Sequence, residues 1–138
     1  MIEAYIDGGC RGNPGNGAVG YVVLEDGTEL YRFGKKIGRC TNNVAEYSAL
    51  IGVLEYLKTI PAAGGSTTIY SDSELLVMQL TGKYRVKSDT LKPLYGQALK
   101  LLKEMKDVRL VHIRREKNKT ADWIVNRVLD DGDYNADL

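Results

Sequence analysis

The chain has 138 residues, a net charge of +1 and an ordinary globular composition, with 43% hydrophobic and 27% charged residues. This length predicts one domain over residues 1–138, with a buried core. No apolar run reaches the length of a membrane span and no apolar leader opens the chain, so we expect a soluble cytoplasmic protein with no membrane partner. Cys10 and Cys40 lack metal-ligand spacing and indicate reduced thiols, and the single histidine, His112, excludes a histidine-rich metal site.

The first third of the chain predicts three strands. Apolar residues alternate over residues 2–6, and residues 18–24 and 29–37 have the composition of further strands. The pair Asp26-Gly27 between the last two is a hairpin signal. Residues 8–17, GGCRGNPGNG, predict a turn because Gly, Asn and Pro dominate them.

Helices and strands alternate in the rest of the chain. Asn42 or Asn43 is the expected N-cap of a helix that runs to about residue 58, and Asn118 the expected cap of the last helix. The expected elements after the first helix are a strand at 67–71, a helix at 73–80, a basic turn at 82–89, a helix at 92–103, a strand at 108–113 and a helix at 118–129. The order βββαβααβα predicts an α/β fold, a five-stranded mixed sheet flanked by helices. We expect the tail from residue 130 to fray.

Four acids stand where a buried core would not place them. Asp7 and Asp72 follow strand-like apolar runs, and Glu46 and Asp122 are expected in the first turn of helices, beside their apolar stripes. If the strands are neighbours, the carboxylates converge at one edge of the sheet, where their repulsion requires protons or cations. Oxygen ligands suit Mg²⁺, and carboxylates around two such ions suit phosphodiester hydrolysis.

Each acid also has an ordinary explanation. Glu46 and Asp122 could interact with the N-terminus of their helices, as acids in the first turn often do. Asp72 could be the N-cap of the next helix, and Asp7 could be an ordinary aspartate between a strand and a turn. The spacing alone does not decide between these alternatives and a shared site.

The positive charge is gathered in clusters, whereas the C-terminus is acidic. Any one cluster is explained by a solvated surface, and together they are local patches able to hold a polyanion. The clusters are Lys35, Lys36 and Arg39; Lys83, Arg85 and Lys87; and Arg114, Arg115, Lys117 and Lys119, with Asp130, Asp131, Asp133 and Asp137 at the end.

Four sequence blocks occur in order over nearly the whole chain: DGGCRGNPGNGAVGY, TNNVAEYSAL, YSDSELLVMQL and REKNKTAD. Together they resemble type 1 ribonuclease H. The resemblance implies the ribonuclease H-like fold and an endonuclease that hydrolyses the RNA strand of RNA·DNA hybrids, leaving 5′-phosphate and 3′-hydroxyl ends. It also implies a monomer that acts with two Mg²⁺ ions, for which Mn²⁺ can substitute.

The same resemblance assigns roles to the acids. Asp7 would bridge the two ions, Asp122 would hold the ion that activates water, and Glu46 and Asp72 would hold the ion beside the leaving group. Arg115 is the expected stand-in for a loop histidine that many relatives have and this chain lacks.

Substrate contacts also follow from the resemblance. The RNA strand would be read by Cys10, Arg11, Gly12, Asn13, Asn43 and Glu74. A DNA phosphate would be held by Arg39, Thr41 and Ser88, and the DNA backbone by Lys83, Arg85 and Lys87. Ser88 replaces an amide-bearing residue, and the turn at 82–89 replaces a basic protruding helix, so weaker binding is expected.

Two other functions stay open from the sequence. One is a non-catalytic module that binds hybrids or other nucleic acids, although phosphate binding gains nothing from clustered carboxylates. The other is a different nuclease with the ribonuclease H fold, since a fold alone does not fix a substrate.

Overall fold

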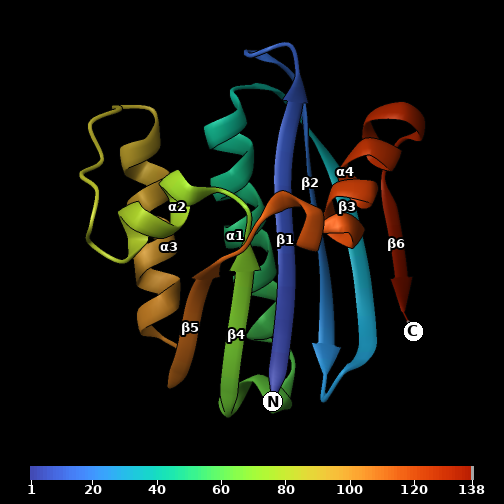
Figure 1. Cartoon of the computed structure of the whole chain (residues 1–138), viewed down its shortest axis with the longest axis vertical. Helices are drawn as coiled ribbons and strands as arrows, with labels where there is room; N and C mark the ends of the chain where they lie inside the picture. The colour runs from blue at the N-terminus through green and yellow to red at the C-terminus, as the bar shows by residue number, and fades with distance from the viewer. Residues whose placement is uncertain (138) are drawn as a thin grey trace.

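The structure, a computed structural model, describes residues 1–137 and is built on one six-stranded mixed sheet (Figure 1). The strands lie in the order β5-β4-β1-β2-β3-β6. They are β1 (Ile2–Arg11), β2 (Gly15–Glu25), β3 (Thr28–Cys40), β4 (Ser66–Ser71), β5 (Asp107–His112) and β6 (Tyr134–Asp137). The helices are α1 (Asn42–Leu57), α2 (Glu74–Leu80), α3 (Leu91–Lys103) and α4 (Lys119–Asp131), with 3₁₀ turns at Pro61–Gly64 and Arg115–Lys117.

The predicted fold class is confirmed. Strands β1, β2 and β3 are antiparallel, while β4 and β5 continue the sheet from β1 in parallel. The expected hairpin joins β2 to β3, where Asp26 and Gly27 have φ values of 49° and 85°. Two successive positive φ values are typical of the tight turn whose twist matches that of antiparallel strands.

Helices cover the two faces of the sheet. In Figure 1, α1 and α3 lie behind the sheet and α4 lies in front of β2 and β3. Ile2, Ala4 and Ile6 of β1 are fully buried in the larger hydrophobic cluster, which α1 completes. A smaller cluster joins Ile124 and Val128 of α4 to the sheet. The alternation predicted for the first strand therefore produces the main core.

The expected turn over residues 8–17 is wrong for most of its length. Strand β1 continues to Arg11 and β2 starts at Gly15, so only residues 12–14 turn. The strands stay paired to Arg11 and Asn16 because their backbones bond to each other whatever the side chains are. A Cβ on Gly15 would lie 1.9 Å from the oxygen of Arg11, so glycine marks a close approach of two chain segments here.

The tail from residue 130, which was expected to fray, contains the end of α4 and a sixth strand where five strands were predicted. Helix α4 continues to Asp131, and β6 pairs with β3. The Tyr134 ring packs edge-on against Trp123, with centroids 5.6 Å apart, and Asp133 accepts a hydrogen bond of 2.8 Å from the amide of Lys36. These tertiary contacts order a segment that has no periodicity of its own. The final tail residue, Leu138, lies outside the described residues.

One of the two predicted helix caps is wrong. Thr41, not Asn42 or Asn43, caps α1, since its Oγ1 accepts the amide of Val44 at 3.3 Å. Helix α1 therefore begins at Asn42, which moves Glu46 from the expected first turn into the second. Asn118 is the N-cap residue of α4, as predicted, but its side chain makes no cap bond to the helix because it bonds elsewhere. Within the described residues, no helix is long and apolar enough to cross a membrane.

Candidate active site

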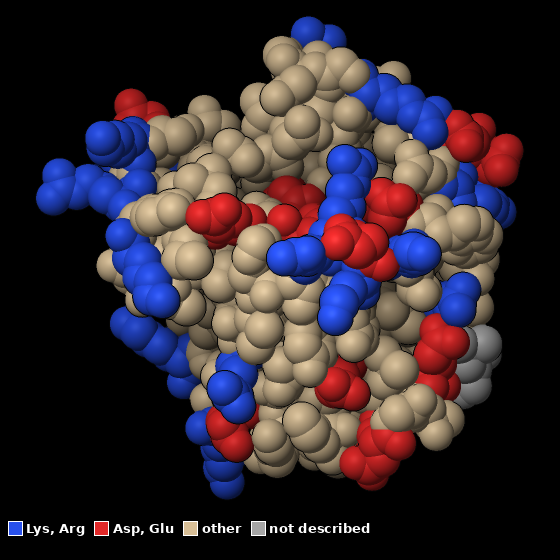
Figure 2. Space-filling model, in the orientation of Figure 1, with Lys and Arg blue, Asp and Glu red and all other residues tan. Residues whose placement is uncertain are grey.

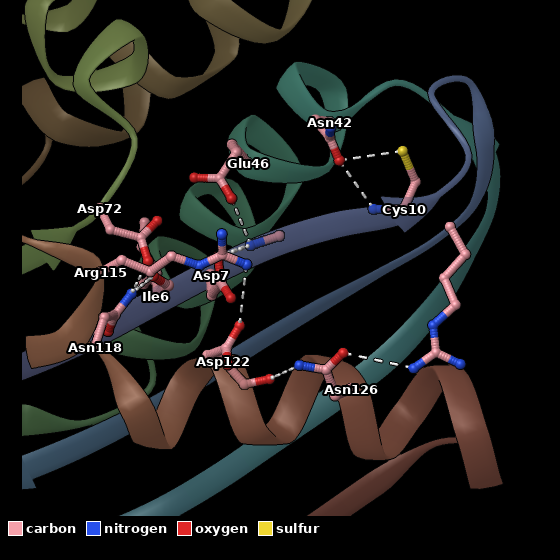
Figure 3. Close-up of polar contacts among 12 residues, drawn as sticks. Ile6, Asp7, Cys10, Asn42, Glu46, Asp72, Arg115, Asn118, Asp122 and Asn126 are labelled. Carbon is pink, nitrogen blue, oxygen red and sulfur yellow. Dashed lines mark hydrogen bonds and ion pairs between the residues drawn. The ribbon is translucent and has the colours of Figure 1, made fainter.

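The register of two parallel strands brings Asp7 and Asp72 together. Strand β1 pairs with β4 up to Ile6 and Ser71, so each aspartate is the next residue of its chain segment at the same edge of the sheet. Figure 3 shows both side chains pointing into the space between β1, α1 and α4. The predicted convergence of these two acids is therefore confirmed.

Gly8 brings Glu46 to the same place. Its backbone amide donates hydrogen bonds to Oε1 of Glu46 at 2.8 Å and to Oδ1 of Asp7 at 3.0 Å. A Cβ at position 8 would lie 2.2 Å from the backbone oxygen of Ala45, so no side chain fits between β1 and α1. The sequence block around Gly8 thus positions α1 as well as the strand.

Three of the four acids form one tight group. Single carboxylate oxygens of Asp7, Glu46 and Asp72 all lie within 4.8 Å of one another. Asp122, in the first turn of α4, stands outside this group but lines the same cleft, whose volume is about 480 Å³. The cleft therefore has three clustered carboxylates and a fourth on its α4 wall.

The site favours protons or cations strongly. Burial, with the charges of Asp72 and Asp122 adding to it, raises the pKa of Asp7 to about 7. Burial and the charge of Asp7 raise the pKa of Glu46 well above its usual range. Oε2 of Glu46 is buried and has no hydrogen-bond partner among the described residues. A buried oxygen without a partner, next to two further carboxylates, fits a hard divalent cation.

Arg115 lies at the rim of this cleft. Its guanidinium is 3.9 Å from Oδ1 of Asp122, and its side chain is 84% exposed (Figure 3). The expected stand-in for the missing histidine thus lies beside one of the four acids.

The turn expected to read RNA is fastened to α1 by Asn42, which the sequence suggested only as a helix cap. Oδ1 of Asn42 accepts hydrogen bonds from the backbone amide and the thiol of Cys10, at 3.1 and 3.2 Å, and the backbone amide of Asn42 donates to Oδ1 of Asn13 at 3.1 Å. Gly12, at φ 83°, lies at the exposed tip of the turn. Arg11 pairs with Asp130 and bonds to Asn126 of α4.

The structure brings some of the expected RNA contacts together and not others. Those that line the cleft with the acids are Cys10, Arg11 and Asn43. Gly12 and Asn13 lie beyond this lining on the turn, and Glu74 bonds to the hydroxyl of Tyr84 at 3.0 Å. Asn126 also lines the cleft and Asn118 bonds to Asp72, and sequence reasoning gave neither a role in the site.

The expected DNA contacts lie outside the cleft. Arg39 is exposed near the end of β3, Thr41 caps α1, and Oγ of Ser88 accepts the amide of Leu91 at 3.3 Å before α3. Lys83, Arg85 and Lys87 are exposed on the segment between α2 and α3. Figure 2 shows basic side chains along the side of the molecule where α2, α3 and β5 lie, and others around the acids near its centre.

Comparison with known proteins adds independent evidence. The family model described as "Reverse transcriptase-like" matches residues 5–128. The crystal structure of RNase H1 from the halophilic archaeon Halobacterium salinarum NRC-1 superposes with a TM-score of 0.89 at 39% sequence identity, covering 94% of this chain and 98% of that one. The chain belongs to the type 1 ribonuclease H family. The resemblance of the four sequence blocks is thereby confirmed.

Other members of the type 1 ribonuclease H family have the same core with different lengths. LC11-RNase H1, solved in complex with an RNA/DNA hybrid and isolated from compost, has a TM-score of 0.87 at 40% identity, with 94% and 97% of the two chains covered. The chain spans 65% of the curated ribonuclease HI of Halobacterium salinarum, at 39% identity over 131 residues. It spans 35% of a bifunctional protein of Mycobacterium tuberculosis, at 37% identity over 132 residues.

Proposed function

We propose that this chain is an endonuclease that hydrolyses the RNA strand of RNA·DNA hybrids and leaves 5′-phosphate and 3′-hydroxyl ends. The observation that carries the proposal is the group of Asp7, Glu46 and Asp72, with oxygens within 4.8 Å, facing Asp122 across one cleft. Membership of the type 1 ribonuclease H family and the hybrid bound by LC11-RNase H1 support the same substrate.

The cofactor in this proposal is a pair of Mg²⁺ ions, with Mn²⁺ as a substitute. Asp7, Glu46, Asp72 and Asp122 would hold them, since the carboxylates are oxygen ligands and one buried oxygen of Glu46 has no other partner. When bound, such ions stabilise the charge on the attacking and leaving oxygens of the phosphodiester.

The side chains around the acids have supporting tasks. The Gly8 amide keeps Oε1 of Glu46 oriented, so the other carboxylate oxygen is the one available to a ligand. The Arg115 guanidinium, beside Asp122, is placed to pair with the new 5′-phosphate and help product leave the cleft. This role for Arg115 replaces that of the missing histidine.

Recognition of the hybrid rests on two surfaces. The turn from Cys10 to Asn13, with Asn43 and Glu74, would contact the 2′-hydroxyls of the RNA strand, which distinguish RNA from DNA. Arg39, with the hydroxyls of Thr41 and Ser88, would bind a phosphate of the DNA strand. Each hydroxyl oxygen already accepts a backbone amide, so its proton is free to be donated to phosphate.

The patch of Lys83, Arg85 and Lys87 would extend the grip along the DNA backbone, mainly through charge. We also propose that the protein acts as a monomer in the cytoplasm. The thiol of Cys10, which donates to Asn42, fits a reducing compartment. Gel filtration with light scattering checks the oligomeric state.

A panel of three duplexes tests the proposal. Strands labelled at either end are assembled as RNA·DNA hybrid, duplex RNA and duplex DNA, and each is incubated with enzyme and Mg²⁺. We expect cuts in the RNA strand of the hybrid alone, and products that a ligase joins only if they carry 5′-phosphate and 3′-hydroxyl. Equal cutting of duplex RNA would contradict the two-surface account, and tight binding without any cleavage would indicate a binding module.

A further inference from the structure

Asn118 connects the segments that carry three of the four acids. Its side-chain nitrogen donates to the backbone oxygen of Ile6 at 2.8 Å and to Oδ2 of Asp72 at 3.2 Å (Figure 3). Its backbone oxygen accepts the amide of Asp122 at 3.1 Å. Because Ile6 directly precedes Asp7, one residue contacts β1, the end of β4 and the first turn of α4.

The chemistry of these contacts leaves one orientation for the Asn118 side chain. The oxygens of Ile6 and Asp72 are both acceptors, so the amide nitrogen must face them, and its two protons serve the two bonds. Its Oδ1 is buried without a partner among the described residues, and the whole residue is 1% exposed. A buried carbonyl without a partner is unfavourable, so the position depends on its two donated bonds.

We propose that Asn118 is a positioning residue for the carboxylate cluster, an inference that rests on the proposed metal-dependent function. It holds Oδ2 of Asp72 and leaves Oδ1 of that carboxylate available to a cation. It also fixes the start of α4, and with it Asp122, relative to β1 and β4. The spacing between Asp122 and the other three acids is therefore set by a neutral side chain that binds neither metal nor substrate.

Two substitutions separate this role from a purely structural one. Asn118→Ala removes both donated bonds, and Asn118→Asp keeps the size but puts an acceptor against Asp72 and Ile6. We expect both to lower kcat roughly 10- to 100-fold, the range seen when a residue that orients metal ligands is lost. The KM for the hybrid should stay within about twofold, since no substrate-binding group changes.

The matched control is Tyr47→Phe. It also removes one buried hydrogen bond, the 2.6 Å bond from the Tyr47 hydroxyl to Gln79, from a residue that is 1% exposed and does not line the cleft. All variants are assayed well below their melting temperatures. Unchanged kcat in both Asn118 variants, as in Tyr47→Phe, would overturn the proposal.

A second readout needs no activity. The rise in melting temperature with added Mg²⁺ or Mn²⁺ reports metal binding, and Asn118→Ala should need roughly 10- to 100-fold more metal for the same rise. Wild type and Tyr47→Phe should respond alike. If the wild type bound metal but did not cut hybrid, the proposed function would fail while this titration still decided the role of Asn118.

A rescue experiment works without metal as well. Asn118→Asp combined with Asp72→Asn exchanges donor and acceptor, so the bond between positions 72 and 118 re-forms. The double variant should have a higher melting temperature than Asn118→Asp alone. This increase should exceed the change in melting temperature that Asp72→Asn causes in the wild type. Strict additivity of the two changes would show that the contact does not couple the residues, and would overturn the proposal.

Discussion

The amide of Gly8 donates a 2.8 Å hydrogen bond to Oε1 of Glu46, across a contact between α1 and β1 that leaves no room for a side chain at position 8. The contact joins residues that are 38 positions apart in sequence. It places a helical glutamate next to Asp7, where burial raises the pKa values of both carboxyl groups. The close packing of α1 on β1 therefore also brings together the two buried carboxyl groups of the cleft.

Adding one methyl group at position 8 should disrupt the fold. In Gly8→Ala the new Cβ would lie 2.2 Å from the backbone oxygen of Ala45, which no side-chain rotation relieves. We expect a loss of about 3 kcal/mol or more in the free energy of unfolding, measured by urea denaturation. Gly96→Ala is the control, because no atom lies within 4 Å of the added Cβ inside α3. It should stabilise the protein by about 0.5–1 kcal/mol, and equal effects of the two changes would contradict the close packing.

The stability of the metal-free protein should depend on pH through Asp7. Its pKa is about 7 in the folded protein against 3.8 ordinarily, so the folded state binds the proton more tightly. The contribution of Asp7 to the free energy of unfolding is then largest below about pH 4, falls as the pH rises to about 7, and is level above that. The loss is about 4 kcal/mol at most.

The variant Asp7→Asn should flatten this profile and melt higher than the wild type above pH 7. Melting curves recorded across the pH range in the presence of a chelator measure both effects, with Asp131→Asn, an exposed change on α4, as control. Added Mg²⁺ should likewise raise the melting temperature of the wild type, by binding the folded state. An Asp7→Asn profile that paralleled the wild type would mean that Asp7 ionises as in the unfolded chain.

Removing the charge of Arg39 should weaken binding and leave the chemistry intact. Arg39 lies outside the cleft, so Arg39→Ala should raise KM with little change in kcat. Loss of one phosphate contact should also reduce the slope of log affinity against log salt by about one unit. Lys58→Ala removes an equal charge that pairs with Glu104, and its salt slope should match that of the wild type. A wild-type slope in Arg39→Ala would exclude the phosphate contact.

The C-terminal strand should contribute stability without contributing to catalysis. Tyr134 packs on Trp123 and beneath Arg127, whose guanidinium carbon is 5.4 Å from the centre of the ring. Tyr134→Ala should lower the free energy of unfolding by about 1–3 kcal/mol. Thermal melting measures the loss, and hybrid cleavage well below the melting temperature should be unchanged. A large fall in kcat at that temperature would show that β6 also shapes the cleft.

The meeting of Asp7 and Asp72 could be expected from the sequence because local rules place both at strand ends. Asp7 and Asp72 follow apolar strands, and parallel neighbours end at the same edge, so their meeting requires only the order of the strands. The fold class followed from the alternation of elements, and the Asp26-Gly27 hairpin from the backbone preference of glycine. Each of these signals lies within a few residues of the chain.

The remaining features depend on contacts between distant segments. Residues 8–11 have the composition of a turn, and only pairing with β2 makes them a strand. Strand β6 has four residues and forms because β3 offers it an edge. Asn118 has the sequence position of a helix cap, and only the folded chain shows its bonds to Ile6 and Asp72. The composition of a segment does not show which distant residues it will contact in the folded chain.

The central claim is that the four acids act as one metal-binding catalytic unit, and a comparison of single and double variants tests it most directly. Cleavage rates of labelled hybrid are measured with and without Mg²⁺ for wild type, Asp7→Asn, Asp72→Asn and the double variant. We predict no cleavage without the metal, a loss of orders of magnitude in each single variant, and little further loss in the double variant, because residues of one unit are not additive. Near wild-type rates for Asp72→Asn with Mg²⁺, or losses that multiply in the double variant, would contradict the account.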